Sequence, residues 1–340
     1  MGQQPTARQV EVTRQITAWY LREYHGTPED QGVVRMFADP ERVGHFAVRL
    51  ADLDGGEPTA FFGLLVATSM FQRRQDLQIL RVLRGIGSTD AAELVNLEAL
   101  RAMSLACACP HGRTLNALLA ECDLSKTDDG VGHCESSPMV ACALKRHTVL
   151  LKRYGHFGKV PTSLAHAIHE AGARHLPELR DKVLADSRDP REAARRLEAA
   201  LTTAWRVSDK IAAMYLSMLA NPDLSPGFAP WQEGVDWTRW VVIDSNVDLF
   251  LRAIEYHGSW TYDARRTFIE ALAEEVDLAG MKAGLRAYNP RIVQQAAYLF
   301  MSVTNRRAIS RDCSHAGPTT CAACHETVRE ICPRRFSLDG

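Results

Sequence analysis

The sequence has little that would take it into or across a membrane. Its most apolar stretch, "AFFGLLVATSMF" (60–71), is about half the roughly 20 residues that a membrane-spanning helix requires. The first fifteen residues also lack the basic and then apolar pattern of a secretory signal peptide. We therefore expect a protein that stays in the cytoplasm and has no membrane partner.

Net charge is nearly absent as well. The chain carries 40 Lys and Arg against 41 Asp and Glu, so its overall charge predicts no polyanionic partner. The distribution is less even, because residues 143–160 hold five basic residues and no acidic one, and residues 281–340 hold nine against four. Such local excess is typical of a surface that meets phosphates on one side, or of solvated helix faces.

Strand-like alternation of apolar and polar residues is also rare. Stretches such as "REAARRLEAALTTAW" and "RRTFIEALAEEV" instead space their apolar residues three and four positions apart, which predicts amphipathic helices. Turn signals separate the helical stretches at 52–58, 85–90, 155–161 and 220–230. The short run "WVVID" (240–244) is strand-like but has no evident partner. We predict an all-α fold.

Cysteine, in contrast, is plentiful, with nine in the chain. Four of them follow the spacing C-x7-C-x2-C-x7-C near the end of the sequence: Cys313, Cys321, Cys324 and Cys332. A reducing compartment argues against a disulfide framework, so the grouping indicates a zinc ion or an iron-sulfur cluster. The other five are Cys107, Cys109, Cys122, Cys134 and Cys142, with His111 and His133 nearby. Their spacings match no common zinc module, which leaves a second zinc site and buried thiols as alternatives.

Two other stretches carry candidate catalytic residues. In "AWRVSDKIAAMYLSML" (204–219) a short turn precedes a helix whose first turn holds Lys210, where backbone NH groups can bind a phosphate. A lysine is a nucleophile only in its neutral form, and a solvated helix lysine is the alternative. In "VVIDSNVDLFLRAI" (241–254), Asp244 heads a predicted helix, either as a reactive carboxylate or simply as its N-cap.

Together these stretches resemble the helix-hairpin-helix DNA glycosylases (HhH-GPD superfamily) of the endonuclease III type. "LLVATSMFQRRQD" (64–76) is similar to the family's "LLIAVLLSAQATD", so Gln72 falls on the glutamine that fills the gap left by a flipped base. "HTVLLKRYGHFGKVP" (147–161) looks like the helix and "G-x-VP" turn before the hairpin. "AWRVSDKIA" aligns with "L-P-G-V-G-x-K-T-A" and "IDSNV" with "V-D-T-H-V", which places Lys210 and Asp244 on the catalytic lysine and aspartate.

The resemblance runs in patches from about residue 60 to 333, and it extends to the C-terminal cysteines. The family pattern C-x6-C-x2-C-x5-C aligns with the four cysteines, which implies that they bind a [4Fe-4S] cluster. Three features depart from the pattern. Arg206 and Ser208 replace both hairpin glycines, the cysteine loop is longer on both sides, and Lys210 and Asp244 are 34 residues apart, a wider gap than is usual. These departures indicate a divergent branch.

The resemblance implies two helical domains with the active-site cleft between them. Residues 1–55 would form N-terminal helices that join the cluster domain. Residues 56–225 would form a six-helix barrel with the hairpin, interrupted by an insertion at about 104–140. Residues 226–340 would complete the cluster domain with its four-cysteine loop.

The implied function is that of a DNA glycosylase which flips out and excises a base, with AP lyase activity through Lys210 and Asp244. The implied partner is double-stranded DNA with a damaged or modified base, bound by a monomer that would associate with the nucleoid in a bacterium. The residues expected to contact DNA are Gln72, Arg206, Val207, Ser208, Arg334 and Arg335, and Arg329 is a further candidate.

Two alternatives stay open. The same fold could bind lesion or modified DNA without cutting it, and the base could be a bulky modified one, as in viral DNA, instead of an oxidised pyrimidine. The insertion at 104–140 and the segment 220–240 are expected to shape the base pocket. Three tryptophans of the second segment would either stack on a flipped base or belong to the core: Trp231, Trp237 and Trp240.

Overall fold

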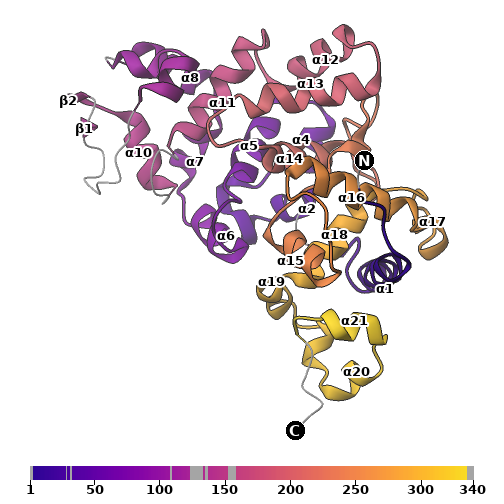
Figure 1. Ribbon diagram of the computed structural model, residues 1–340. Coiled ribbons are helices and arrows are strands. Elements are labelled where there is room, and N and C mark those ends of the chain that lie inside the picture. The colour runs from indigo at the N-terminus through magenta and orange to yellow at the C-terminus, as the bar shows by residue number, and fades with distance from the viewer. Residues whose placement is uncertain are drawn as a thin grey trace. The chain divides into compact units, whose positions relative to one another are not determined.

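The computed structural model of the chain is almost entirely helical, which confirms the predicted all-α fold (Figure 1). It describes residues 3–27, 29–30, 33–107, 109–122, 133–134, 137–151 and 158–334. Within these ranges the strands that occur are a short antiparallel pair, β1 (His133–Cys134) and β2 (Ser137–Ala141). Strands this short leave no periodic signal in a sequence, so the pair was not predicted.

Spatial proximity divides the chain into two compact units. Unit 1 comprises Met1–Val33, Asn221–Ala229 and Thr238–Gly340, and unit 2 comprises Val34–Ala220 and Pro230–Trp237. The first helix therefore shares a unit with the C-terminal cysteines. Residues 34–55, which the sequence analysis grouped with that helix, belong to unit 2.

Unit 2 is a helical assembly around α5 (Pro58–Ser69). Pro58 occupies the first turn of α5, and the Glu57 carboxylate accepts a hydrogen bond from the Thr59 amide. From Ala60 to Ser69 every residue of α5 is buried, because an evenly apolar helix has no face that favours water. The most apolar stretch of the sequence is thus a core helix. Among the described helices, none is long and apolar enough to cross a membrane.

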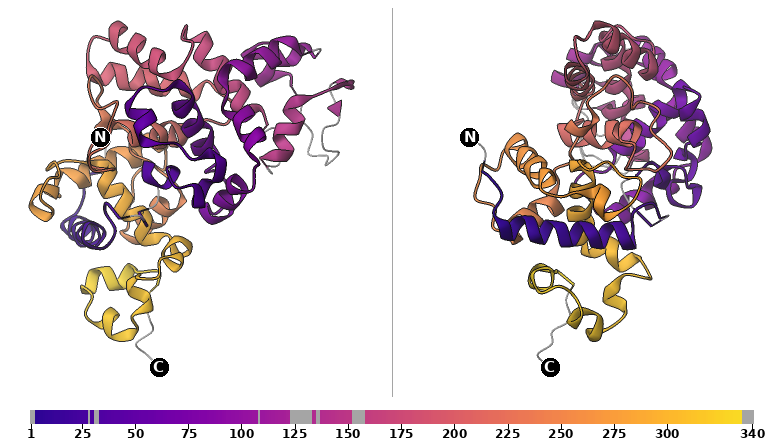
Figure 2. Two further views of the ribbon diagram at one scale, coloured as in Figure 1. Left: turned by 180° about the vertical axis from the view of Figure 1, so that it is seen from behind. Right: turned by 90° about the vertical axis from the view of Figure 1, so that its right-hand side faces the viewer.

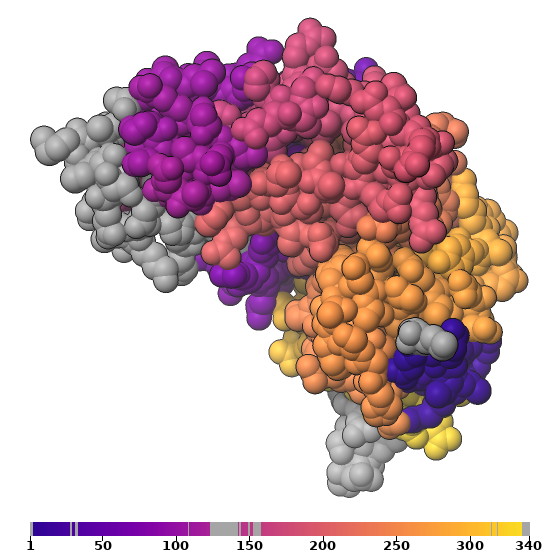
Figure 3. Space-filling model, turned by 45° about the horizontal axis from the view of Figure 1, so that its top comes forward, coloured from indigo at the N-terminus to yellow at the C-terminus, as the bar shows by residue number. Residues whose placement is uncertain are grey.

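The helices that contact α5 include α4 (Leu50–Asp54), α7 (Ser88–Val95), α11 (Lys159–Glu170), α12 (Leu176–Asp186) and α14 (Asp209–Ala220). The other helices of unit 2 are α2 (Val34–Phe37), α3 (Pro40–Val43), α6 (Asp76–Arg84), α8 (Leu97–Ala106), α9 (Leu115–Ala120), α10 (Ala143–Leu150) and α13 (Pro190–Thr202), with 3-10 turns η1 (Gly44–Phe46) and η2 (Pro110–Gly112). Both α8 and α9 pack on α11, and in Figure 3 their purple surface continues into the pink surface of α11 to α13.

Unit 1 is arranged around α18 (Pro290–Met301), whose residues are nearly all buried. Four helices pack on it: α1 (Ala7–Glu23), α15 (Ser245–Ala253), α16 (Tyr262–Glu274) and α19 (Val303–Ala308). The chain continues through η4 (Cys313–His315), α20 (Pro318–Ala322) and α21 (Glu326–Ile331), and α21 contacts α1 (Figure 2). The remaining elements are α17 (Leu278–Met281) and the 3-10 turn η3 (Trp237–Arg239).

Two of the three tryptophans in the segment 220–240 are core side chains. Trp231 is 4% exposed and stacks on Phe61 of α5 with ring centroids 5.0 Å apart, and Trp240 is 1% exposed. Of the two alternatives considered for these residues, packing in the core is the one observed. Trp237 is only partly buried.

Candidate functional site

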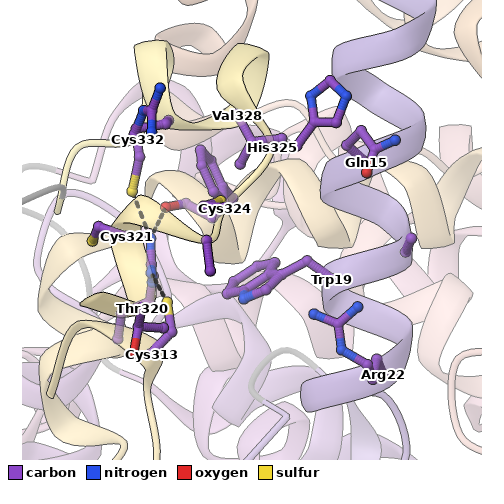
Figure 4. A pocket seen from close by; sticks show the side chains of 15 residues that line it. Gln15, Trp19, Arg22, Cys313, Thr320, Cys321, Cys324, His325, Val328 and Cys332 are labelled. Atoms are coloured by element: carbon purple, nitrogen blue, oxygen red, sulfur yellow. Dashed lines mark hydrogen bonds between the residues drawn. The ribbon is translucent and has the colours of Figure 1, made fainter. Parts of the chain in front are cut away.

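The four C-terminal cysteines line one cavity of about 510 Å³ in unit 1 (Figure 4). Cys313 lies in η4, Cys321 and Cys324 at the end of α20, and Cys332 directly after α21. Among the described residues, no three His, Cys, Asp or Glu side chains surround one point as the ligands of a single ion would. The structure therefore places all four cysteines on the wall of one cavity.

Short helices bring these cysteines to the cavity. Gly317, with φ of 95°, provides the left-handed turn into α20, and Pro318 fixes the first turn of that helix. Because α20 and α21 have five and six residues, neither would be stable alone, and α21 is supported by α1. Gln15 and Trp19 of α1 face the cysteine loop across the cavity (Figure 4).

A fully buried arginine, Arg306 of α19, contacts the cysteine loop from the helix that precedes it. Its Nη2 donates to Cys313 Sγ at 3.2 Å, and its Nη1 lies 3.7 Å from Cys332 Sγ. The rings of Trp19 and Phe300 lie 5.0 and 5.3 Å from the guanidinium carbon, which is a favourable cation-π geometry. Arg306 thus links two of the four cysteines to the helix that precedes them.

Asp312 supplies the counter-charge for Arg306. Its buried carboxylate accepts from Arg306 Nε at 2.7 Å, from Arg334 Nη1 at 3.1 Å and from the Tyr24 hydroxyl at 2.8 Å. Burial opposes the charge of Arg306, but the hydrogen bond to Asp312 raises the pKa of Arg306 above its ordinary value. Burial and the same carboxylate raise the pKa of Tyr24. Arg306, Asp312 and Tyr24 therefore form a buried, hydrogen-bonded cluster.

Sequence reasoning found only part of this cluster. It named Arg334 as a DNA contact, whereas the structure gives the Arg334 side chain 12% exposure and a bond to Asp312. Arg335 lies outside the described residues. Arg306 and Asp312 were missed, although Asp312 directly precedes a predicted ligand cysteine. The DNA contacts of Arg334 and Arg335 stay predictions.

The cavity wall is suited to an anionic group. Three arginines contribute to it, Arg22, Arg306 and Arg329, and its described lining contains no Asp or Glu. Burial raises the pKa of the Cys313 and Cys324 thiols, and Arg306 partly offsets this effect at Cys313. Four thiol donors with nearby guanidinium groups fit a cysteine-ligated iron-sulfur cluster, whose total charge is negative.

In unit 2 the predicted hairpin joins α13 to α14. Arg206 has φ of 61°, a left-handed conformation that a non-glycine residue rarely adopts. The next residue, Val207, is buried, and its amide donates to the Ala204 carbonyl at 3.2 Å. The Ser208 carbonyl then accepts from the amides of Ile211 and Ala212, which begins α14. The segment is thus a tight turn even though both expected glycines are replaced.

Lys210, in the first turn of α14, reaches the turn that follows α5. Its Nζ donates to the Phe71 carbonyl at 3.0 Å. The adjacent Gln72 donates from Nε2 to the Ser69 carbonyl at 2.7 Å, which satisfies a carbonyl at the end of α5. Two residues that were predicted to serve one function, Gln72 and Lys210, therefore belong to neighbouring turns in unit 2.

Asp244 is the N-cap of α15 in unit 1. Its Oδ1 accepts from the amides of Asn246 and Val247 at 3.0 and 2.9 Å, as expected from the N-cap alternative. The preceding residues are extended but form no strand, and Tyr262 holds them by donating to the Val241 carbonyl. The catalytic role of Asp244 stays a prediction.

A buried polar group lies in the same unit as Asp244. Arg291 at the start of α18 is 2% exposed and donates to Gln294 and Gln295. Burial lowers the pKa of Arg291, and the charges of Asp30 and Asp244 are among the causes that oppose the shift. Asp244 is thus close enough to Arg291 for their charges to interact.

The basic stretch 143–160 is not an exposed patch in the residues described. Lys145 and Lys159 are buried, and Lys159 Nζ donates to the Leu118 carbonyl at 2.8 Å. Arg146 pairs with Asp90 and Glu93. The other two basic residues, Lys152 and Arg153, lie outside the described residues. The expectation of a phosphate-facing surface here is therefore wrong for the described basic side chains.

In the second group of cysteines, Cys122 and Cys142 have apolar surroundings. Cys122 and Cys142 pack with Leu118 and Leu144 in a small buried cluster. Cys109 is buried and Cys107 is partly exposed, while the side chain of Cys134 lies outside the described part of the chain. Small buried thiols, one of the two alternatives, account for Cys122 and Cys142.

Comparison with protein-family models, with curated proteins and with solved structures finds no match to this chain. The functional assignment therefore rests on the residues and on the geometry of the two units.

Proposed function

We propose that the protein is a DNA glycosylase with AP lyase activity, which acts on double-stranded DNA containing a damaged or modified base. The observation that carries the proposal is the left-handed backbone of Arg206. This residue stands where the hairpin pattern has its first glycine, and glycine occupies such positions because it tolerates positive φ. Arg206 thus has a backbone conformation typical of glycine at a position where the pattern has glycine.

The two units supply a basis for the domain assignment in the proposal. Unit 2, in which the buried α5 is surrounded by other helices, would be the six-helix barrel that carries the hairpin. Unit 1 would be the cluster domain, completed by α1. The proposal requires Lys210 of unit 2 and Asp244 of unit 1 to act on one nucleotide in a cleft between the domains.

Binding begins at the hairpin. The free amides at the start of α14 and the turn at Arg206, Val207 and Ser208 would hold a phosphate of the DNA backbone. A base must leave the stack to react, which costs a few kcal/mol. Gln72 would offset part of that cost by filling the gap, after its amide leaves the Ser69 carbonyl.

Base excision then uses the two candidate catalytic residues. The nitrogen lone pair of neutral Lys210 forms a bond to C1′ while the glycosidic bond breaks, and the base departs with the bonding electrons and is protonated by solvent. Positive charge that develops on the sugar is stabilised by the Asp244 carboxylate. Loss of a proton and ring opening give a Schiff base. Removal of a C2′ proton then breaks the bond between C3′ and its phosphate oxygen.

The four cysteines would hold a [4Fe-4S] cluster that braces the C-terminal loop. Each thiolate would ligate one iron, and Arg306 would donate hydrogen bonds to the sulfurs of Cys313 and Cys332. Four thiol groups on the wall of one cavity, with Arg306 beside two of them, support the cluster in this proposal. The cluster would position the loop, and no reaction step passes through it.

Borohydride trapping on DNA that contains an abasic site tests the lyase role. The reagent reduces the Schiff base, so the wild type should become covalently linked to DNA and Lys210→Ala should not. Lys182→Ala is the matched control, because Lys182 is an amine of the same unit on α12. A wild type that fails to trap, or a Lys210→Ala variant that traps equally, would refute the lyase assignment.

A second candidate function is binding without cleavage. It is favoured by the engagement of Lys210 Nζ with the Phe71 carbonyl and of Asp244 with two backbone amides. A panel of duplexes with oxidised pyrimidines or bulky modified bases separates the two functions. We expect release of at least one base in a single turnover, whereas tight binding to a modified duplex with no release would favour the second function.

Metal analysis tests the cluster. We expect about four iron atoms per chain and a brown protein when purification excludes air. A colourless protein with one zinc per chain would show that the cysteines form a different centre.

A further inference from the structure

Left-handed backbone conformations are rare in this chain outside glycine. Among the described residues other than glycine, positive φ occurs at Arg73 (56°), Arg206 (61°) and Glu255 (59°). Each such residue costs free energy that glycine would save, and such residues often mark functional sites. Two of the three are arginines of unit 2.

The two arginines belong to turns that one hydrogen bond joins. Arg206 lies in the hairpin four residues before Lys210, and Arg73 lies two residues after Phe71. Lys210 Nζ donates to the Phe71 carbonyl at 3.0 Å, so the turn after α5 and the hairpin meet at the candidate catalytic lysine.

Both arginines are exposed, and among the described residues neither forms an ion pair with a carboxylate. The packing of Arg206 is against a ring, since its guanidinium carbon lies 5.3 Å from the centroid of Trp205. Trp205 is itself fixed, because its amide donates to Ser163 Oγ at 2.9 Å. On strained turns where glycine would be more stable, the chain therefore holds two positive charges that have no ion-pair partner among the described residues.

We infer that Arg73 is a DNA-backbone contact and that it binds a phosphate of the same duplex as the hairpin. A guanidinium suits this role because it binds phosphate oxygens through paired N–H groups. The left-handed turn fixes the direction in which the side chain leaves the backbone. Arg73 and Arg206 would hold two phosphates of one duplex, one from each of the turns that Lys210 joins. This inference rests on the proposed DNA function, and it adds a residue that the family resemblance did not supply.

Arg73→Gly separates a binding role from a structural one. Glycine removes the guanidinium and relieves the strained backbone, so the melting temperature should stay equal or rise. Binding to an unmodified duplex, measured by fluorescence anisotropy on the full chain, should weaken about tenfold. The slope of log K against log salt should fall in magnitude by about one, because one phosphate contact is lost.

Three further variants make the result specific. Arg73→Asn, which also tolerates positive φ, should reproduce the lost affinity and the lower slope if Arg73→Gly is poorly folded. Arg73→Lys should keep most of the slope, because it keeps the charge. Arg191→Gln removes an exposed arginine from the first turn of α13, at the end of that helix far from the hairpin, and should leave both quantities unchanged.

The outcomes distinguish this inference from the proposed function. If the wild type binds duplex DNA with a salt-dependent affinity but both neutral Arg73 variants have the same slope as the wild type, Arg73 is not a phosphate contact and the proposed function still stands. If Arg191→Gln lowers the slope as much as Arg73→Gly, the effect is one of net charge and the inference fails. A wild type without salt-dependent DNA binding would overturn both.

Discussion

Arginine serves opposite purposes in the two units. In unit 1, Arg306 is fully buried and bonded to Asp312, and its guanidinium also contacts two cysteine sulfurs. In unit 2, Arg73 and Arg206 are exposed, lie on left-handed turns and form no ion pair among the described residues. In the first arrangement, the charge of Arg306 stabilises the cysteine loop through Asp312 and two sulfurs. The second leaves charge exposed on a backbone conformation that costs stability.

This difference predicts which measurement each substitution changes. Removal of a buried, paired charge leaves its partner without compensation and lowers the free energy of unfolding. We expect replacement of an exposed arginine on a strained turn by glycine to lower affinity for DNA and to leave stability equal or higher. The predictions below test this separation.

Asp244 gives the strictest test of this separation. It belongs to unit 1, where charges are buried and stabilising, yet it is proposed to act in catalysis. We expect Asp244→Asn to lower the single-turnover rate of base release roughly a thousandfold, equivalent to about 4 kcal/mol. Asparagine is as good an N-cap as aspartate, so the melting temperature should change little. A variant that keeps both its melting temperature and its rate would make Asp244 a purely structural cap.

Arg306→Gln tests the buried charge pair. The substitution leaves the Asp312 carboxylate, which has no exposed surface, without its closest counter-charge. We expect the free energy of unfolding in urea to fall by about 3 kcal/mol. The control is Arg334→Gln, which removes the other arginine bound to Asp312 and should cost about 1 kcal/mol. Equal effects of the two variants would contradict the central position given to Arg306.

Asp30 extends the comparison to pH. Burial raises its pKa to about 7, although the hydrogen bond from Tyr20 and the charge of Arg291 act in the other direction. An unfolded carboxyl titrates near pH 4, so the folded chain binds more protons between pH 4 and 7. The stability that Asp30 contributes is therefore fully present below about pH 4 and is lost as the pH rises to about 7.

Asp30→Asn should remove this dependence, because asparagine stays neutral at every pH. The free energy of unfolding of the variant, minus that of the wild type, should increase by on the order of 2 kcal/mol from pH 5 to pH 8. Urea titrations at the two pH values give this difference. A constant or falling difference would mean that Asp30 is charged in the folded protein.

Arg206→Gly should have the smallest effect on stability. Glycine relieves the left-handed backbone and alanine does not, so Arg206→Gly should be more stable than Arg206→Ala by about 1 kcal/mol. Both variants lose the guanidinium and should lose DNA affinity to the same extent. Equal stability of the two variants would show that the turn at Arg206 carries no strain.

The sequence was informative where spacing and periodicity specify geometry. The regular spacing of apolar residues predicted the helices, and the cysteines grouped by their spacing, Cys313 to Cys332, line one cavity. Gln72 and Lys210 were expected in one site, and the structure joins their turns through the carbonyl of Phe71. These features follow from local patterns of residue spacing, which one sequence is enough to reveal.

Other features had no such signal. A charged residue is normally exposed, so nothing in the sequence distinguished buried Arg306 and Asp312 from solvated neighbours. The two strained turns could not be predicted, because arginine occupies both positions. Glycine there would have indicated a left-handed conformation. The basic stretch 143–160 was predicted to be an exposed surface, but tertiary packing buries two of its lysines, Lys145 and Lys159.

The most direct test of the proposed activity is to identify the residue that becomes linked to DNA. The reduced complex with abasic DNA can be digested with protease and nuclease, and the modified peptide sequenced by mass spectrometry. We predict a single adduct on the Nζ of Lys210. An adduct on another amine, or the absence of any adduct from folded protein that binds the same DNA, would contradict the assignment of this chain as a lyase acting through Lys210.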